Sequence, residues 1–379
     1  MLNFPHCADT KSLDYWNGLV TKVLKIHKNL ESLKISVSDD QVPHRIRHEN
    51  NSKYSLSPNI MDILEKKQNL KVLQLKGLMI KNEIGMQICR MRNLKFLHLS
   101  YDDRAIVSPY FVDLIADNLN QLETIEIFTG EYSDDYDGIK FRSAFNNLFR
   151  NNCKTLKKIN VRIMPYFCRS LEMKFYQPEC VTLKSLDLCQ NLEEFRGPAH
   201  GHDLKLICES QILKKLELKD ITQHNLEDIL SHGMSLPNLK HLAIKTEQIF
   251  IKSMFVQVSE QYLPTLERLY ISSEKIFSHY TRLDLETLEE LLENFPTLKS
   301  LQIDGDYITA IDVPNECLTD IFRDYGIFII FGKVMEIEMC DRQKNFEDFL
   351  EQDPLLLGKY YKEKRNFAKW CENNIGYGY

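Results

Sequence analysis

A few groups of side chains have the types and spacing that could bind a metal ion. His200, His202 and Cys208 lie close together, and His44 and His48 are four residues apart. Imidazole nitrogens and thiolates are the usual ligands of zinc, which takes four of them in a structural site. The first group lacks a fourth ligand at the usual spacing, and the second falls in a polar loop. Loop polarity accounts for both groups, so we expect no metal site.

Other short motifs that carry chemistry are also incomplete. Asp134, Asp135 and Asp137 precede Gly138, but the alternation of ligands and the final Glu of a calcium loop are missing. The phosphate-binding patterns GxGxxG and GxxxxGKS/T, the nucleophile pattern GxSxG and the zinc pattern HExxH do not occur. We therefore expect no catalytic residues and no cofactor, and we predict that the chain is not an enzyme.

The composition is that of a protein with a hydrophobic core. Of 379 residues, 43% are hydrophobic and 27% charged, with a formal net charge of −6, which excludes general disorder. The longest uncharged apolar stretch, Tyr325–Gly332, is far shorter than the roughly 20 residues of a membrane-spanning helix. The N-terminus lacks the apolar core of a secretory signal, and the ten cysteines form no CxxC pair. We expect inert thiols in a cytoplasmic or nuclear protein.

A short phrase, leucine-charge-x-aliphatic-x-aliphatic, recurs along most of the chain, and we number its positions as columns. Columns one, four and six are Leu, Ile or Val in every copy, and column two is Lys or Glu in every copy. The copies follow one another at about 30 residues on average, which indicates a repeat architecture. The leading leucines are Leu30, Leu70, Leu94, Leu122, Leu156, Leu183, Leu213, Leu239, Leu266 and Leu298.

Each repeat is predicted to be a strand followed by a helix. On a strand, columns four and six point to one face and columns three, five and seven to the other, so we expect the first set in the core and the second in water. Ser57-Pro58 and Ser108-Pro109 each pair an N-cap side chain with a proline at the first helical position. Apolar stripes of helical period follow in several repeats. They are Phe111, Leu114, Ile115 and Leu119; Phe141, Ala144, Phe145, Leu148 and Phe149; Leu226, Ile229 and Leu230; and Leu285, Leu288, Leu291, Leu292 and Phe295.

From about Leu30 to Asp306 the chain resembles the leucine-rich repeat family, in its F-box-associated and ribonuclease-inhibitor-like subclasses. The family signature LxxLxLxxN is matched by Leu183, Leu186, Leu188 and Asn191. The resemblance implies an α/β solenoid, a horseshoe with a parallel concave β-sheet and a helical convex side. The ninth position varies from copy to copy, so we expect no continuous asparagine ladder after the strands.

These patterns predict one solenoid domain with a cap at each end. Residues 1–29 form an N-terminal helical cap, with a helix over Leu13–Leu24, and residues 30–314 form the leucine-rich repeat solenoid of about ten repeats. Residues 315–379 form a C-terminal cap, with one or two closing strands in Tyr325–Met339 and helices beyond. Such caps cover the end repeats.

The concave face is the predicted binding surface, because a rigid sheet presents many side chains without an ordering cost. Columns three, five and seven contain eight basic and four acidic residues, which favours an acidic or phosphorylated protein partner. A pI near 6.0 and the absence of a dense basic cluster speak against nucleic acid, and nothing indicates a membrane partner. The candidate partner-binding residues are Lys34, Lys76, Phe96, His98, Phe128, Lys158, Arg162, Lys215, Lys219, His241, Lys245, Arg268 and Tyr270.

The resemblance implies a non-enzymatic protein-binding solenoid, a substrate-recognition subunit of a cullin-type ubiquitin ligase. Such a subunit binds the cullin adaptor through an F-box, and the 29 residues before Leu30 are too few for one, so we expect an F-box upstream if this function holds. The alternative is a stand-alone scaffold or inhibitor, similar to ribonuclease inhibitor, that binds an acidic or phosphorylated protein on its concave face. A third alternative is an accessory protein in RNA processing.

Overall fold

The computed structural model describes the strands and helices of the repeats and part of the turns between them. The described residues are 2–4, 10–37, 57–76, 82–100, 108–130, 138–164, 184–198, 206–207, 210–221, 236–246, 263–273, 283–284, 289, 292–293, 295–305, 311–312 and 328–331. The chain divides into two compact units, residues 1–197 and 198–379.

The strands of the first unit are parallel and lie in chain order. They are β1 (Leu2–Phe4), β2 (Ser32–Val37), β3 (Val72–Lys76), β4 (Phe96–Ser100), β5 (Thr124–Gly130), β6 (Lys158–Met164) and β7 (Glu194–Pro198). Each column of the phrase pairs with the same column of the next strand; Leu73, for example, lies opposite Leu33 and Leu97. The predicted α/β architecture, with a parallel sheet built from one strand per repeat, is confirmed.

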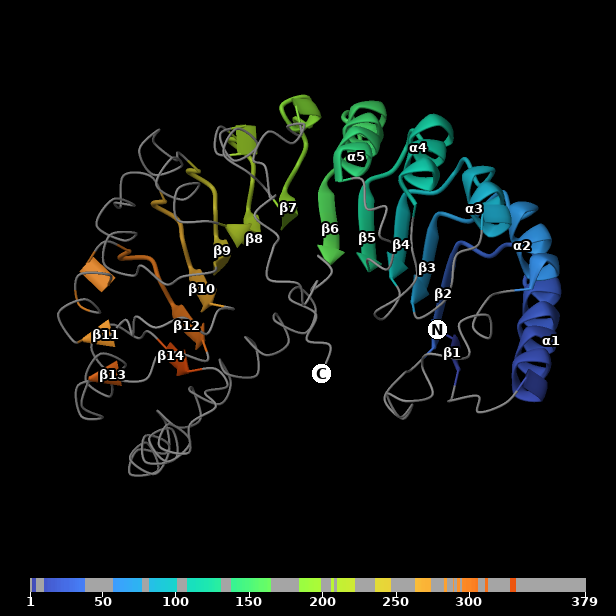
Figure 1. The fold of residues 1–379 in the computed structure, drawn as a ribbon, viewed down its shortest axis with the longest axis horizontal. Coiled ribbons are helices and arrows are strands. Elements are labelled where there is room, and N and C mark those ends of the chain that lie inside the picture. The colour runs from blue at the N-terminus through green and yellow to red at the C-terminus, as the bar shows by residue number, and fades with distance from the viewer. Residues whose placement is uncertain are drawn as a thin grey trace, which may run out of the picture. The chain divides into compact units, whose positions relative to one another are not determined.

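Helices lie along one side of these strands (Figure 1). They are α1 (Thr10–Ile26), α2 (Pro58–Glu65), α3 (Asn82–Cys89), α4 (Pro109–Asn118), α5 (Gly138–Asn152) and the 3₁₀ turn η1 (Lys184–Leu186). Each packs against the next helix along the chain. The proline-initiated helices are confirmed, and the Ser108 hydroxyl accepts a hydrogen bond from the N–H of Phe111 at 3.2 Å. Ser57 lies at the N-cap of α2, but its side chain makes no capping hydrogen bond.

The core lies between the sheet and the helices. Columns four and six supply its sheet side, with Leu33, Ile35, Leu73 and Leu75 as examples, all buried. The predicted stripe of α5 supplies its helix side, where the ring of Phe145 stacks 5.9 Å from that of Phe149, centroid to centroid. Burying each such side chain stabilises the fold by about 1.5–3 kcal/mol.

The second unit repeats the same strand pattern. Its parallel strands are β8 (Lys215–Ile221), β9 (His241–Thr246), β10 (Arg268–Ser273), β12 (Ser300–Gly305) and β14 (Phe328–Phe331), and β11 (Leu283–Asp284) pairs with β13 (Ile311–Asp312). Strand β14 lies within the segment where a closing strand is predicted. Leu292 and Phe295 are buried as expected. The predicted stripe at Leu226–Leu230 and the cap helices after residue 331 lie outside the described residues.

The prediction for the sixth repeat is wrong. The segment Leu183–Cys189 contains the η1 turn, not a strand, and Leu188 is 47% exposed. The strand of the sixth repeat is β7, nine residues later. Leu192, which is 4% exposed, takes the position of the leading leucine in this repeat. We call each repeat, with its strand and helix, a coil of the solenoid. Column six of β7 is Gly197. Because the prediction required Leu, Ile or Val in column six, it did not recognise this segment as a copy of the phrase.

A glycine at this position has a physical reason. A Cβ added to Gly197 would lie 3.0 Å from the carbonyl oxygen of Val161 and 3.6 Å from the ring of Phe195. A side chain at this position would therefore press on the backbone of the neighbouring strand β6. The preceding Asn191, together with Leu192 and Glu193, matches the Asn-Leu-charge start of several other copies, and that signal could have identified the strand.

The N-terminus also differs from the prediction. The helix predicted over Leu13–Leu24 is present as α1 and extends further at both ends. Strand β1, which was not predicted, precedes it and pairs with β2, Leu2 opposite Ile35. Three residues are too few to show an alternating pattern, so the sequence carries no clear signal for this strand.

Candidate functional site

The candidate site is the inner face of the sheet, which we define as columns three, five and seven, on the side away from the helices. In the first unit its accessibility changes from strand to strand. Lys34 on β2 and Lys76 on β3 are exposed, while Phe96 on β4 and Phe128 on β5 are half-buried. These four predicted residues lie on neighbouring strands of one parallel sheet.

A chain of hydrogen bonds crosses the inner face between β4 and β6. The Nδ1–H of His98 donates to Oε2 of Glu126 at 2.6 Å, and Nε2 of His98 lies 2.8 Å from the hydroxyl of Ser100. The ammonium of Lys158 lies 2.8 Å from Oε1 of Glu126. The ring of Phe128 meets that of His98 edge-on at 5.3 Å between centroids. Both oxygens of the Glu126 carboxylate are thus occupied.

The charge of Glu126 is stabilised by these partners. Burial alone would raise its pKa, but the hydrogen bond from His98 and the ammonium of Lys158 outweigh burial and lower the pKa from 4.5 to about 2. Because the carboxylate stays ionised, Nδ1 of His98 carries the proton. In the neutral ring Nε2 then accepts the hydrogen bond of Ser100.

The order Ser100, His98, Glu126 is also the order of groups that activates a serine nucleophile. A serine hydrolase further needs N–H donors directed at an oxyanion. The backbone of β4 is paired with β3 on one side and with β5 on the other as far as Ser100. Both ring nitrogens of His98 are occupied, so the described contacts of these three residues join β4 to β5.

The expectation that columns three, five and seven all face water is wrong at several positions. His98 is 8% exposed and Tyr270 is 1% exposed, although both were predicted as accessible anchors. Asn160 of β6 and Ala243 of β9 are buried as well. For His98 the reason is the ring of Phe128 beside it and the hydrogen bonds on both nitrogens. Tyr270 lies opposite Ala243, whose small side chain leaves room for the ring.

The remaining predicted residues fall into two groups. Lys215, His241 and Arg268 are half-buried and lie side by side at the start of β8, β9 and β10, each in column three. Arg162, Lys219 and Lys245 lie on β6, β8 and β9, but their side chains are outside the described part of the chain. Whether any of these residues contacts a partner stays a prediction.

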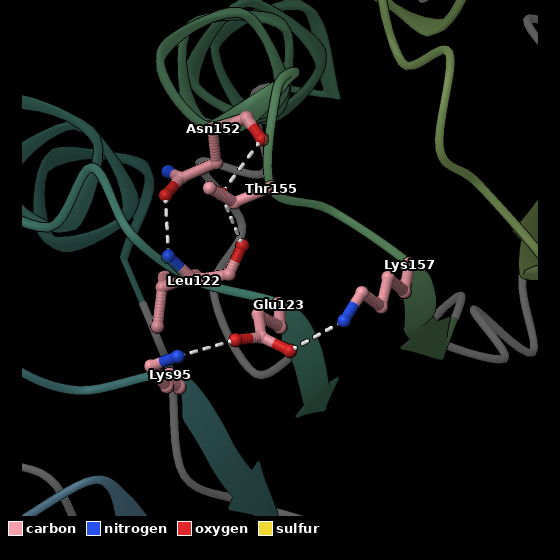
Figure 2. A network of polar contacts seen from close by, with 6 residues as sticks. All are labelled: Lys95, Leu122, Glu123, Asn152, Thr155 and Lys157. Carbon is pink, nitrogen blue, oxygen red and sulfur yellow. Dashed lines mark hydrogen bonds and ion pairs between the residues drawn. The ribbon is translucent and has the colours of Figure 1, made fainter.

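The lysines and glutamates of column two, which immediately precede the strands, form a ladder of ion pairs between successive repeats (Figure 2). In the first unit Glu123 lies between Lys95 and Lys157, at 2.7 and 2.8 Å. In the second unit Glu267 lies between Lys240 and Lys299, at 3.4 and 3.2 Å. The hydrogen bond from Lys157, followed by that from Lys95, lowers the pKa of Glu123 to about 2. The column-two charges therefore serve contacts between coils.

A second polar ladder lies just before the strands. Asn152 accepts from the N–H of Leu122, and Thr155 donates to the carbonyl of Leu122 (Figure 2). Asn152 also donates to the carbonyls of Leu119 and Leu148. The residue preceding the leading leucine makes the same kind of contact in other coils, at Asn93, Asn191, Asn238, Thr265 and Thr297. No sequence argument assigned this function to these residues. The recurrent Asn or Thr before the leucine was its signal.

The candidate metal ligands cannot be placed. His44, His48, His200, His202, Cys208 and the acidic run before Gly138 lie outside the described residues. Within the described ranges, no three His, Cys, Asp or Glu side chains are grouped so as to hold a metal ion. Burial raises the pKa of the Cys89 and Cys189 thiols to about 12, so both stay protonated. No described helix is long and apolar enough to span a bilayer.

Comparison with known proteins gives a structural match at a low level of superposition. No family model matches the chain, and no curated protein matches its sequence. Among solved structures, an internalin (InlF) from Listeria monocytogenes is similar over 85% of this chain and 90% of its own, at 11% identity and a TM-score of 0.30. At that level of superposition the assignment of the fold rests on the strand order and register above, which are those of a leucine-rich repeat solenoid.

Proposed function

We propose that the chain is a non-enzymatic protein-binding solenoid that holds its partner on the inner face of the sheet. The observation that supports this proposal is the contrast between the two faces of β2 and β3. Leu33, Ile35 and Leu73 are buried beneath the helices, while Lys34 and Lys76 remain exposed on the same strands. A preformed sheet offers such side chains without the entropic cost of ordering a loop.

Site-specific photo-crosslinking tests this proposal. A photoreactive amino acid replaces Gln74 on β3 or Thr124 on β5, both half-buried on the inner face, and in a control it replaces Lys22, exposed on α1. We expect a discrete protein adduct in cell extract from an inner-face position but not from the helix position. Adducts of equal yield from Lys22, or none from Gln74 and Thr124, would contradict the proposal.

The finer proposal is recruitment of substrates to a cullin-type ubiquitin ligase, which the resemblance to F-box leucine-rich repeat proteins supports. For this finer proposal, we expect the protein translated from the complete transcript to co-purify with the cullin adaptor. The alternative is a stand-alone scaffold or inhibitor. Capture of a partner without the adaptor would favour this alternative.

A further inference from the structure

The inner face of β2, β3 and β4 is positively charged and contains no carboxylate. On the neighbouring strands β5–β7, Lys158 already pairs with Glu126 and Glu194, whereas among the described residues no carboxylate pairs with a lysine of β2, β3 or β4. We call their nine inner-face residues the cationic strip. They are Ser32, Lys34, Ser36, Val72, Gln74, Lys76, Phe96, His98 and Ser100.

The two lysines of the cationic strip are available to a partner. Lys34 and Lys76 are exposed, and neither ammonium has a hydrogen bond or ion pair among the described residues. Lys34 lies opposite Gln74, and Lys76 lies opposite Ser36 and Ser100. These half-buried neighbours can donate or accept hydrogen bonds, but they carry no charge that would neutralise the lysines.

Lys158 shows the opposite situation on β6. Its ammonium lies 2.8 Å from Oε1 of Glu126 and 3.8 Å from Oε2 of Glu194, and it is only 28% exposed. An acidic partner would have to compete with two carboxylates already in place. In the described part of the first unit, the positive charge that this face offers to a partner is therefore concentrated on β2 and β3 and not on β6.

The cationic strip also has an apolar end. Val72 and Phe96 lie opposite each other in column three, and both are half-buried. Aromatic side chains in such positions often supply a large share of binding energy because they bury much area at low entropic cost. Cations in columns five and seven thus lie beside an apolar contact in column three.

From this arrangement, and resting on the proposed function, we infer that the partner presents an acidic segment, rich in Asp or Glu and carrying one apolar side chain. Its carboxylates pair with Lys34 and Lys76, and its apolar side chain packs on Phe96. Recognition of phosphate commonly uses the planar, bidentate fork of arginine, whereas lysine acts as a point charge. The strip contains lysines and no arginine, which favours carboxylates over a phosphate group.

Fluorescence anisotropy with labelled peptides tests the inference. The probe is a short Glu-rich peptide with one central Leu, compared with a peptide in which Gln replaces every Glu and with one in which phosphoserine replaces them. We expect the Glu-rich peptide to bind best and its affinity to fall as ionic strength rises from about 0.1 to about 0.5 M, because exposed charges are screened.

Variants locate the binding to the cationic strip. Combined Lys34→Glu and Lys76→Glu should weaken the Glu-rich peptide at least about tenfold, and the neutral pair Lys34→Gln and Lys76→Gln by less. Phe96→Ala should weaken it about fivefold, but should not affect a peptide without the Leu. The matched control is Lys22→Glu with Lys25→Glu, two exposed lysines of α1, which should leave the affinity unchanged.

Several results would overturn the inference. They are equal affinity for the Gln-rich peptide, tighter binding of the phosphoserine peptide, or equal loss in the α1 control. Crosslinking separates this failure from failure of the proposed function. A partner captured at Gln74 or Thr124 that the Glu-rich peptide does not displace removes the inference and leaves the proposed function intact. Absence of capture at both positions removes the proposed function itself.

Discussion

The side-chain oxygen of Asn152 accepts a hydrogen bond from the backbone N–H of Leu122 at 2.8 Å, across 30 residues of sequence. The amide nitrogen of Asn152 donates to two carbonyls, at 2.8 and 3.0 Å, and the residue is 1% exposed. One side chain thus satisfies the end of its own helix and the turn of the preceding coil. A buried polar group with all its partners in place stabilises the fold. If one partner is removed, the other buried polar groups are left without a hydrogen bond, and their desolvation is no longer compensated.

We predict that Asn152→Ala lowers the free energy of unfolding by about 2–4 kcal/mol, since the carbonyl of Leu119 and the N–H of Leu122 lose the partner that this side chain supplies, and the carbonyl of Leu148 loses one of its donors. Chemical denaturation followed by circular dichroism measures the change. The control is Asn151→Ala, next in the chain but exposed, which removes a single hydrogen bond to Ala116 and should cost less than about 1 kcal/mol. Equal losses from both variants would show that the ladder does not stabilise the stack.

The carboxylate of Glu126 predicts a pH dependence of stability. Its pKa is about 2 in the folded chain against an ordinary value of 4.5. A carboxyl group whose pKa is lowered by folding stabilises the fold above 4.5, and this contribution is lost as the pH falls from 4.5 towards 2. We expect Glu126→Gln to lose about 2 kcal/mol at neutral pH and to flatten the acid limb of the stability profile.

The control for this prediction is Glu65→Gln on α2, whose carboxylate meets Arg90 at 3.3 Å on the surface. Exposed pairs of this kind contribute little, so this variant should lose less than about 1 kcal/mol at neutral pH. An unchanged acid limb in Glu126→Gln would contradict the prediction. It would show that, in solution, the hydrogen bond from His98 and the ion pair with Lys158 do not lower the pKa of the Glu126 carboxyl group.

Two glycines in helices should respond to the same substitution with opposite signs. A Cβ at Gly85 in α3 would lie 2.7 Å from ring atoms of the buried Phe111, whereas a Cβ at Gly18 in α1 would meet no atom within 4 Å. We predict that Gly85→Ala destabilises the chain by about 1–3 kcal/mol through overpacking, and that Gly18→Ala stabilises it by up to about 1 kcal/mol through helix propensity. Thermal denaturation of both variants checks the sign; stabilisation by Gly85→Ala would contradict the packing of α3 on α4.

Two leucines test the position of the sixth strand. Leu192 is buried and leads the coil of β7, while Leu188 is 47% exposed. Leu192→Ala should cost about 2–5 kcal/mol because it opens a cavity in the core, and Leu188→Ala should change stability by less than about 0.5 kcal/mol. A larger loss at Leu188 would support the strand that the sequence pattern had placed over Leu183–Cys189.

The repeats themselves were predictable because burial acts on every second residue of a strand. A strand covered by helices on one face must place aliphatic side chains in columns four and six. This pattern can be seen within a single copy, for example at Leu97 and Leu99 of β4. The same argument failed at β7. There Gly197 replaces the aliphatic residue, and an added Cβ would come too close to the carbonyl oxygen of Val161, a contact that only the neighbouring strand reveals.

The sequence by itself determined the coil, the alternation of strand and helix, and which columns enter the core, since these follow from local periodicity. Only the tertiary structure decided which inner-face residues remain accessible. Lys34 and Lys158 belong to the same face by sequence, but Lys158 lies beside two carboxylates, and Lys34 has no carboxylate partner in the part of the chain that the structure describes. The partners of a side chain come from coils about 30 residues away, and their distance and orientation are set by the stacking of coils.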